Sequence, residues 1–97
     1  MHVISRKTLR EFGERVPDAR VALEAWFREA QAAVWANSAE LKHQYRTASI
    51  INAERVVFNI GGNKYRLVVR INYASKAVFL RFVGTHREYD QIDVESV

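Results

Sequence analysis

Basic side chains that can bind phosphate are concentrated in one stretch of this sequence. Between Arg55 and Arg87 there are seven lysines and arginines and no aspartate or glutamate, whereas residues 88–97 hold four acids and no base. Guanidinium and ammonium groups bind phosphate oxygens through charge-assisted hydrogen bonds, and arginine can donate two parallel bonds. The stretch therefore predicts a surface for a polyanion.

RNA is the polyanion on which such a surface could also act as a catalyst. The 2′-hydroxyl of RNA can attack the neighbouring phosphorus, so the protein must align the attack, stabilise the added negative charge and move two protons. Arg66, Arg70 and Arg81 are the candidates for holding the phosphate. His86 is the candidate for proton transfer, because imidazole exchanges protons near neutral pH. Tyr89 could orient the 2′-hydroxyl, share the proton transfer or stack on a base.

Each of these residues also has a simpler interpretation. A basic face on a sheet is more often a solvated surface than an active site, and a single histidine after a strand is more often a surface residue. Tyr89 could pack against Phe82, and Asp90 could either orient His86 or cap a turn. A noncatalytic nucleic-acid-binding module and a structural protein that docks an acidic partner are therefore the alternatives to a nuclease.

Strands are the elements that must position these side chains. Apolar residues recur at every second position, and Gly61-Gly62-Asn63 interrupts the first run with residues that accept a positive φ, as a hairpin turn requires. A hairpin centred on Gly62 and Asn63 predicts a register that places like residues together on one face. The expected pairs are Ile60 with Tyr65, Phe58 with Leu67, and Val56 with Val69.

The opposite face of the same sheet, which we call the cationic face, is expected to carry the polar residues. A third strand over residues 77–83 should add Arg81 to it and send Val78, Leu80 and Phe82 into the core. Residues 86–90 then form a short helical turn. Besides Arg66, Arg81, His86 and Tyr89 as catalytic candidates, we assign four residues to RNA binding. These are Asn59, Lys64, Arg70 and Asn72.

Two helices are predicted before the sheet. Ser5 is expected to cap a helix over residues 6–15, which Pro17 closes, and Asp18 to cap a second helix. The apolar face of the second helix is predicted to comprise Ala19, Ala22, Leu23, Trp26, Phe27, Ala30, Ala33 and Val34. Shorter elements are expected as a strand at residues 2–4, a helix at 39–45 capped by Ser38, and a strand or buried connection at Ile50 and Ile51. The result is an α+β domain in which helices pack on one face of a mostly antiparallel sheet, and the cationic face is left free.

Length and composition limit the remaining possibilities. The chain of 97 residues, 48% hydrophobic and 27% charged, is expected to form a single domain over residues 1–97. With no cysteine, thiolate chemistry and disulfides are excluded, and the three histidines are too scattered to predict a metal site. No apolar run approaches the roughly 20 residues of a membrane span. We therefore expect a cytoplasmic protein with no metal, no cofactor and no membrane partner.

Several segments resemble the HigB-type toxins of bacterial type II toxin-antitoxin systems. They are residues 57–67 (VFNIGGNKYRL), Arg70-Ile71-Asn72-Tyr73, Arg81-Phe82-Val83-Gly84-Thr85-His86 and Tyr89-Asp90. Residues 35–45 and the N-terminal helical pair also match, so the resemblance covers essentially the whole chain.

This resemblance implies a RelE-like fold and a metal-independent endoribonuclease that cleaves mRNA, usually on the translating ribosome. It also implies neutralisation by a HigA-type helix-turn-helix antitoxin, whose complex with the toxin binds promoter DNA. In RelE-like toxins the working residues are basic side chains on the sheet and basic or aromatic ones near the C-terminus. In this sequence they correspond to Lys64, Arg66, Arg70, Arg81, His86 and Tyr89.

Overall fold

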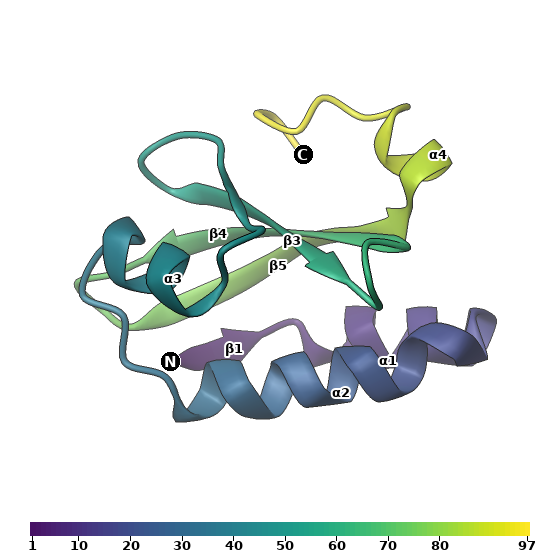
Figure 1. Ribbon diagram of the computed structural model, residues 1–97, viewed down its shortest axis with the longest axis horizontal. Coiled ribbons are helices and arrows are strands. Elements are labelled where there is room, and N and C mark those ends of the chain that lie inside the picture. Colours follow the sequence, from purple (N-terminus) through teal and green to yellow (C-terminus); the bar gives the residue numbers. More distant parts are fainter.

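A five-stranded sheet forms the centre of the computed structural model, which describes residues 1–97 (Figure 1). Its strand order is β1-β5-β4-β3-β2, and every neighbouring pair is antiparallel except β1 with β5. The strands are β1 (His2–Ile4), β2 (Ser49–Ile50), β3 (Arg55–Ile60), β4 (Tyr65–Asn72) and β5 (Ala77–Thr85). The helices are α1 (Arg6–Arg15), α2 (Pro17–Ala32), α3 (Ser38–Gln44) and α4 (His86–Tyr89). The predicted α+β class with a mostly antiparallel sheet is confirmed.

Helices α1 and α2 cover one face of this sheet (Figure 1). They bury the apolar stripe that their spacing predicted, and the Trp26 ring meets the Phe58 ring of β3 edge to face at 5.3 Å. Val34 was wrongly included in that stripe, because α2 ends at Ala32 and Val34 is 71% exposed. None of the helices is both long and apolar enough to span a bilayer.

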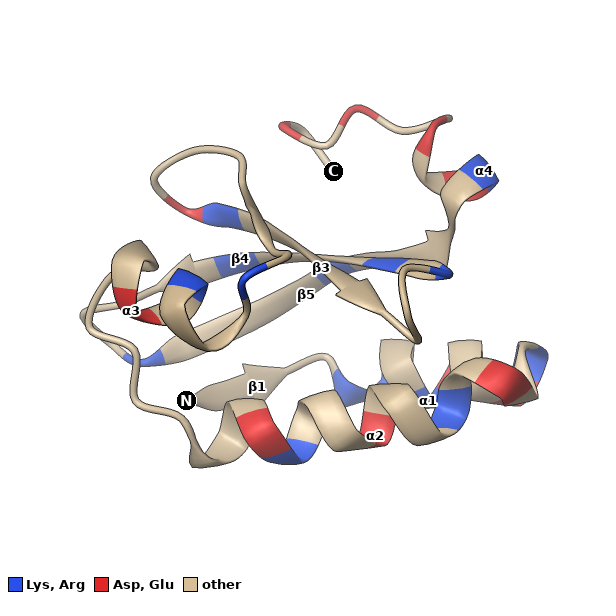
Figure 2. Ribbon diagram, in the orientation of Figure 1, with Lys and Arg blue, Asp and Glu red and all other residues tan.

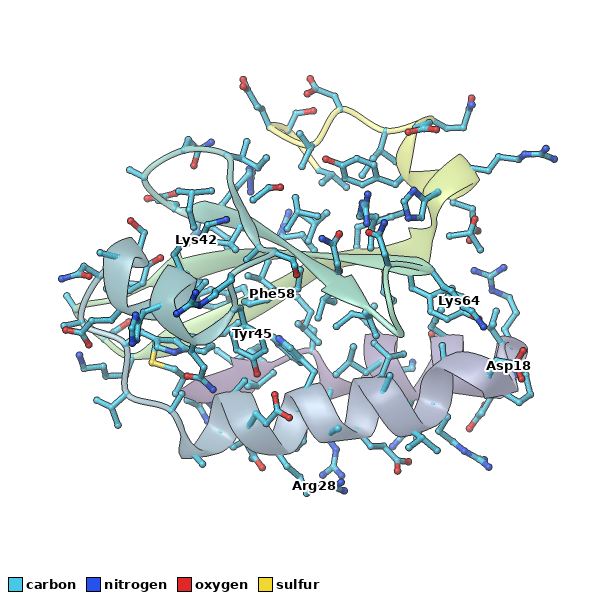
Figure 3. The ribbon with its side chains drawn as sticks, viewed as in Figure 1. Asp18, Arg28, Lys42, Tyr45, Phe58 and Lys64 are labelled. Carbon is cyan, nitrogen blue, oxygen red and sulfur yellow. The ribbon has the colours of Figure 1, made fainter.

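A second aromatic contact joins α3 to the sheet. The side chains of Tyr45 and Phe58 point toward one another (Figure 3), with ring centroids 5.0 Å apart. The Tyr45 hydroxyl donates to Glu29 Oε1 at 2.5 Å. Burial, and then this hydrogen bond to a carboxylate, raise the pKa of Tyr45 well above its usual value. Tyr45 therefore anchors the end of α3 on the helical side of the sheet.

The helix starts differ from their predicted caps. Ser5 precedes α1 but has φ 76° and makes no side-chain capping bond. Pro17 is the first residue of α2 rather than the end of α1, because its fixed φ and missing N–H suit the first helical position. Asp18 therefore lies inside the first turn. Asn37, not Ser38, caps α3, and its Oδ1 accepts from the Glu40 N–H at 3.0 Å.

The β3–β4 hairpin has the predicted register. Ile60 pairs with Tyr65, Phe58 with Leu67, and Val56 with Val69. The turn between the two strands places Gly61, Gly62 and Asn63 at φ 64°, 64° and 79°. These are the residue types that tolerate the left-handed region, so the local turn sequence set the register of both faces.

Strand β5 departs from the predicted alternation. Leu80 pairs with Val69 and Phe82 with Val68, which leaves Arg81 as an extra residue in a bulge. Such a bulge shifts the alternation by one position. The assignment of Phe82 to the core is therefore wrong: Val83 is buried in the core, and Phe82 lies on the cationic face. The strand also runs to Thr85, two residues beyond its predicted end.

The cationic face is not free, in contrast to the prediction. Residues 91–97 pass over it on the side away from α1 and α2 (Figure 1), and two arginines bind their main chain. Arg55 Nε donates to the Glu95 carbonyl at 2.8 Å, and Arg81 Nε donates to the Val97 carbonyl at 3.3 Å. Of the two alternatives for residues 50–51, the strand is confirmed at Ile50, which lies in β2 and is 39% exposed.

Candidate active site at one end of the cationic face

Arg66, near the start of β4, is held by amide side chains from the neighbouring strand and turn. It pairs across the sheet with Asn59, and its Nη1 donates to Asn59 Oδ1 and, at 2.6 Å, to Asn63 Oδ1. Asn59 is itself oriented, because its Nδ2 donates to the Thr47 carbonyl at 2.9 Å. The guanidinium therefore occupies one defined position at the turn end of the face.

A glycine lies opposite Arg66 on β5. A Cβ atom at Gly84 would lie 2.6 Å from Phe82 Cζ, which is closer than Cβ atoms come to other atoms, and in a tight contact of 3.1 Å with Glu88 Cβ. Glycine is therefore needed here for the Phe82 ring to cross the strand and for α4 to approach the sheet. This close approach brings the residues of α4 to the Arg66 end of the face.

Helix α4 is short but well capped. Thr85 Oγ1 accepts from the Glu88 N–H at 3.2 Å while Glu88 Oε1 accepts from the Thr85 N–H at 3.0 Å, which is a complete capping box. Glu88 also pairs with Arg15 of α1 at 3.0 Å. The backbone hydrogen bond from Thr85, followed by Arg15, lowers the pKa of Glu88. Glu88 thus fixes α4 against both the sheet and the helical layer.

The fixed α4 directs two side chains toward Arg66. The Arg66 guanidinium carbon lies 5.8 Å from the centre of the Tyr89 ring, within the range of a cation–π contact. His86 Nε2 contacts the Asn63 carbonyl oxygen. Arg66 lies 20 or more residues before His86 and Tyr89 in the sequence. In the fold, the three side chains meet around the β3–β4 turn.

The hydrogen bonds leave specific atoms of this cluster available. Both hydrogen bonds that Arg66 donates to the protein use Nη1, so Nε and Nη2, which lie on the same edge of the guanidinium, have no protein acceptor. That edge matches two oxygens of a phosphate. A carbonyl can only accept, so this contact assigns a hydrogen to His86 Nε2 and leaves Nδ1 as the ring nitrogen that faces a substrate proton. The cluster can bind an anion and transfer protons beside it.

Arg70 and Asn72 lie away from this cluster, and Arg81 and Lys64 make no hydrogen bond to it. Arg70 is four residues along β4 from Arg66, about 13 Å at the rise of a strand, and its guanidinium lies over the Phe79 ring at 5.2 Å. Asn72 is farther still, and its Oδ1 accepts from the Ser75 N–H at 3.1 Å. Arg81 binds the C-terminal segment. Lys64 lies exposed in the β3–β4 turn (Figure 3).

Sequence reasoning missed the central role of Asn63, which it treated only as a turn residue. Its amide and carbonyl contact Arg66 and His86 respectively. Thr47 was also missed, because its contribution is a main-chain carbonyl that has no sequence signal. Asp90 proves to be a helix cap, since its main-chain N–H donates to the His86 carbonyl at 2.9 Å.

The charge distribution separates the cationic face from its cover. Figure 2 shows Lys and Arg along β3 and β4, and Asp and Glu on the segment that follows α4. A shallow hollow of about 480 Å³ beside Arg66 is lined by Thr47, Asn59, Gly62 and Asn63. No three His, Cys, Asp or Glu side chains are grouped so that they could hold a metal ion.

A larger hollow, about 800 Å³, lies between α1 and α2 on the other side of the molecule. Its walls alternate arginines (Arg6, Arg10, Arg20 and Arg28) with Glu14 and Glu24, over Leu9, Leu23 and Phe27. It contains no histidine or tyrosine. We therefore place the chemistry at the cluster where Arg66, His86 and Tyr89 converge, next to the smaller hollow, whose Asn59 and Asn63 contact Arg66.

Comparison with known proteins gives one consistent family. A family model described as HigB_toxin, RelE-like toxic component of a toxin-antitoxin system, matches residues 19–92. The mRNA interferase toxin HigB of Escherichia coli strain K12 is 29% identical over 92 residues, which cover 93% of this chain and 88% of the relative. The mRNA interferase HigB of Escherichia coli O6:H1 is 24% identical over 94 residues, covering 95% and 91%.

Proposed function

The chain belongs to the HigB family of RelE-like toxic components of toxin-antitoxin systems, and from this premise we propose that it is an endoribonuclease that cleaves mRNA and so inhibits translation and growth. The curated relatives are named mRNA interferases and match more than nine-tenths of the chain. The observation that carries the proposal is the convergence of Arg66, His86 and Tyr89 at one end of the cationic face. It would act within a single RelE-like domain over residues 1–97.

The proposed reaction uses the substrate's own nucleophile. The 2′-oxygen forms a bond to phosphorus as the bond from phosphorus to the 5′-oxygen breaks, leaving a 2′,3′-cyclic phosphate and a 5′-hydroxyl. Arg66 Nε and Nη2 would bind the nonbridging oxygens and stabilise the charge of the phosphorane. One proton leaves the 2′-hydroxyl and one reaches the 5′-oxygen, and His86 Nδ1 and the Tyr89 hydroxyl are the groups that would exchange them. Because a guanidinium supplies the charge stabilisation, we propose a metal-independent reaction.

The remaining basic residues would guide the RNA rather than react with it. Arg70 and Arg81 extend the positive charge from Arg66 along the sheet, and Lys64 extends it around the turn. Arg81 touches the C-terminal segment rather than the cluster, so we now assign it to RNA binding instead of catalysis. Asn59 positions Arg66 by accepting a hydrogen bond from its Nη1. Asn72 uses its Oδ1 in a turn, so it would contact RNA only through its amide nitrogen.

Membership in a toxin-antitoxin system implies an antitoxin as partner and mRNA as substrate. We propose more narrowly that the antitoxin is of the HigA helix-turn-helix type, and that promoter DNA is bound only through the complex of the two proteins. We also propose that cleavage takes place on the translating ribosome, in the cytoplasm.

Mapping of mRNA 5′ ends after brief induction of this chain in bacteria, without an antitoxin, tests the activity. The wild type should create discrete new ends inside coding regions, and these ends should carry 5′-hydroxyls. The His86→Ala, Tyr89→Phe double variant should create none. A matched double variant, His43→Ala with Tyr73→Phe, changes the same residue types away from the cluster and should cleave like the wild type.

The same experiment distinguishes the proposal from a noncatalytic nucleic-acid-binding module. Such a module would create no ends, and His86→Gln or Tyr89→Phe would leave its RNA affinity and its effect on growth unchanged. A nuclease should lose turnover in these variants while its RNA affinity is nearly intact. New ends that persist in the double variant would show that the chemistry lies elsewhere on the chain.

A further inference from the structure

Asn63 is the only residue of the β3–β4 turn that contacts both Arg66 and His86. Its side-chain Oδ1 accepts from Arg66 Nη1 at 2.6 Å, and its main-chain carbonyl contacts His86 Nε2. One residue thus joins the phosphate-binding group of β4 to the proton-transfer group of α4.

The side-chain contact determines how Arg66 presents its donors. Together with Asn59, Asn63 accepts from Nη1 and from no other atom of the guanidinium. A guanidinium has five N–H groups in a rigid plane, so fixing one nitrogen with two acceptors also fixes where Nε and Nη2 point. Without Oδ1, Asn59 alone would hold Nη1, so the guanidinium could turn about that single hydrogen bond and lose its orientation toward a phosphate.

The main-chain contact determines the tautomer of His86. Because the Asn63 carbonyl has no proton to give, the neutral imidazole must keep its hydrogen on Nε2. Proton exchange with a substrate is thereby assigned to Nδ1. This contact needs the Asn63 carbonyl to point at α4, and its direction depends on the left-handed backbone of the turn.

These two tasks require an unusual residue. Asn63 has φ 79°, a conformation that glycine adopts readily and that asparagine and aspartate tolerate better than other residues. Glycine at this position would satisfy the backbone but offer no acceptor to Arg66. Aspartate would offer an acceptor but would also neutralise the guanidinium. Asparagine alone supplies the backbone, an acceptor and no charge.

We propose that Asn63 is a positioning residue of the active site, which orients Arg66 through its side chain and sets the His86 tautomer through its carbonyl. The inference rests on the proposed ribonuclease function and adds to it the device that aligns the two groups. If Asn63 has this role, its substitutions should change kcat and KM separately, which substitutions of a purely structural turn residue would not do.

Asn63→Gly and Asn63→Asp test the side-chain part, with RNA cleavage measured across pH and concentration. Asn63→Gly keeps the backbone and should lower kcat by about 10- to 100-fold, as misorientation of a reacting group does, while KM and the melting temperature stay near those of the wild type. Asn63→Asp should keep the alignment but raise KM, because the carboxylate neutralises Arg66. Asn37→Gly, which removes a similar amide hydrogen bond from the cap of α3, should leave kcat unchanged.

Nitrogen NMR of the His86 ring, recorded on the protein without RNA, tests whether the Asn63 carbonyl sets the tautomer. The wild type and Asn63→Gly should both show the Nε2–H tautomer, since glycine retains the carbonyl. An Nδ1–H tautomer in the wild type, or a kcat of Asn63→Gly equal to that of the wild type, would overturn the proposal. If the wild type cleaves no RNA, the proposed function fails, while the ring tautomer and the Arg66 side-chain signals of Asn63→Gly still decide whether Asn63 positions these two groups.

Discussion

The two ends of the cationic face carry similar charge but differ in what their arginines contact. At the turn end, Arg66 is held from one side by two amides and keeps Nε and Nη2 without a protein acceptor. At the other end, Arg55 and Arg81 donate to carbonyls of the C-terminal segment, and Arg70 lies over Phe79. Positive charge alone therefore does not locate the site; the convergence of a positioned arginine with His86 and Tyr89 does.

The segment that covers the second end is acidic. Asp93 and Glu95 lie in it, and its main chain supplies the acceptors for Arg55 and Arg81. Figure 2 shows Asp and Glu on this segment, which lies above the sheet. The covered end therefore offers a weaker field to RNA than its count of arginines suggests, and the difference between the ends can be tested by substitution.

Leu67→Ala should have the largest effect and tests the alternation of β4, on which both ends depend. Leu67 is fully buried beneath the sheet, one residue from Arg66. We expect the free energy of unfolding in urea to fall by about 2 to 5 kcal/mol, the range for removing a buried leucine side chain, with cleavage per folded molecule unchanged. A variant as stable as the wild type would mean that the two faces of β4 are assigned the wrong way round.

Arg66→Ala compares the two ends directly. Cleavage should slow by about 10²- to 10³-fold, which is typical of removing one donor that stabilises transition-state charge, and growth arrest should be lost. Arg70→Ala is the matched control at the covered end: it should weaken RNA binding in a salt-dependent way and leave the rate of bound RNA nearly unchanged. Equal losses in the two variants, with both proteins folded, would remove the distinction between the ends.

Acid should loosen the turn end through Glu88. Because its pKa is lowered in the folded state, its carboxylate stabilises the fold fully above the ordinary value of 4.5, and this contribution is lost as the pH falls through the lowered pKa. Glu88→Gln should be less stable than the wild type at pH 7, by no more than about 1 kcal/mol for an exposed pair. Melting curves should show the difference vanishing at low pH.

Glu11→Gln supplies the control for that measurement. Glu11 pairs with Lys7 at 3.6 Å on the surface of α1 and has no link to α4. Its substitution should change the melting temperature less than Glu88→Gln does at pH 7. A larger change would mean that surface charge in general, rather than the clamp on α4, governs the effect.

Local patterns predicted much of this arrangement. The Gly61-Gly62-Asn63 turn was sufficient for the hairpin register, because two-residue periodicity and a positive-φ turn determine which side chains face the core. The same pattern placed Arg66 on the cationic face, and the short turn at residues 86–89 is the predicted one. These features depend on neighbours in the sequence.

The features that were missed depend on contacts between distant segments. The bulge at Arg81 has no signal in a strand that otherwise alternates, and it moved Phe82 from the expected core face to the cationic face. The C-terminal segment reaches Arg55 across 40 residues of sequence, so only the fold could show that this arginine is occupied. Every residue has a main-chain carbonyl, so the sequence could not show that the one of Asn63 contacts His86.

The order in which the site residues are synthesised follows from the position of α4. Arg66 and Asn63 leave the ribosome with the β3–β4 hairpin, but their partners His86 and Tyr89 come some 20 residues later, after β5. Strand β1, although made first, also finds its partner only in β5. A nascent chain of the proposed toxin would therefore lack an assembled site while β5 and α4 are still inside the ribosome that makes it. The fold thus delays the appearance of activity until late in translation of the toxin itself.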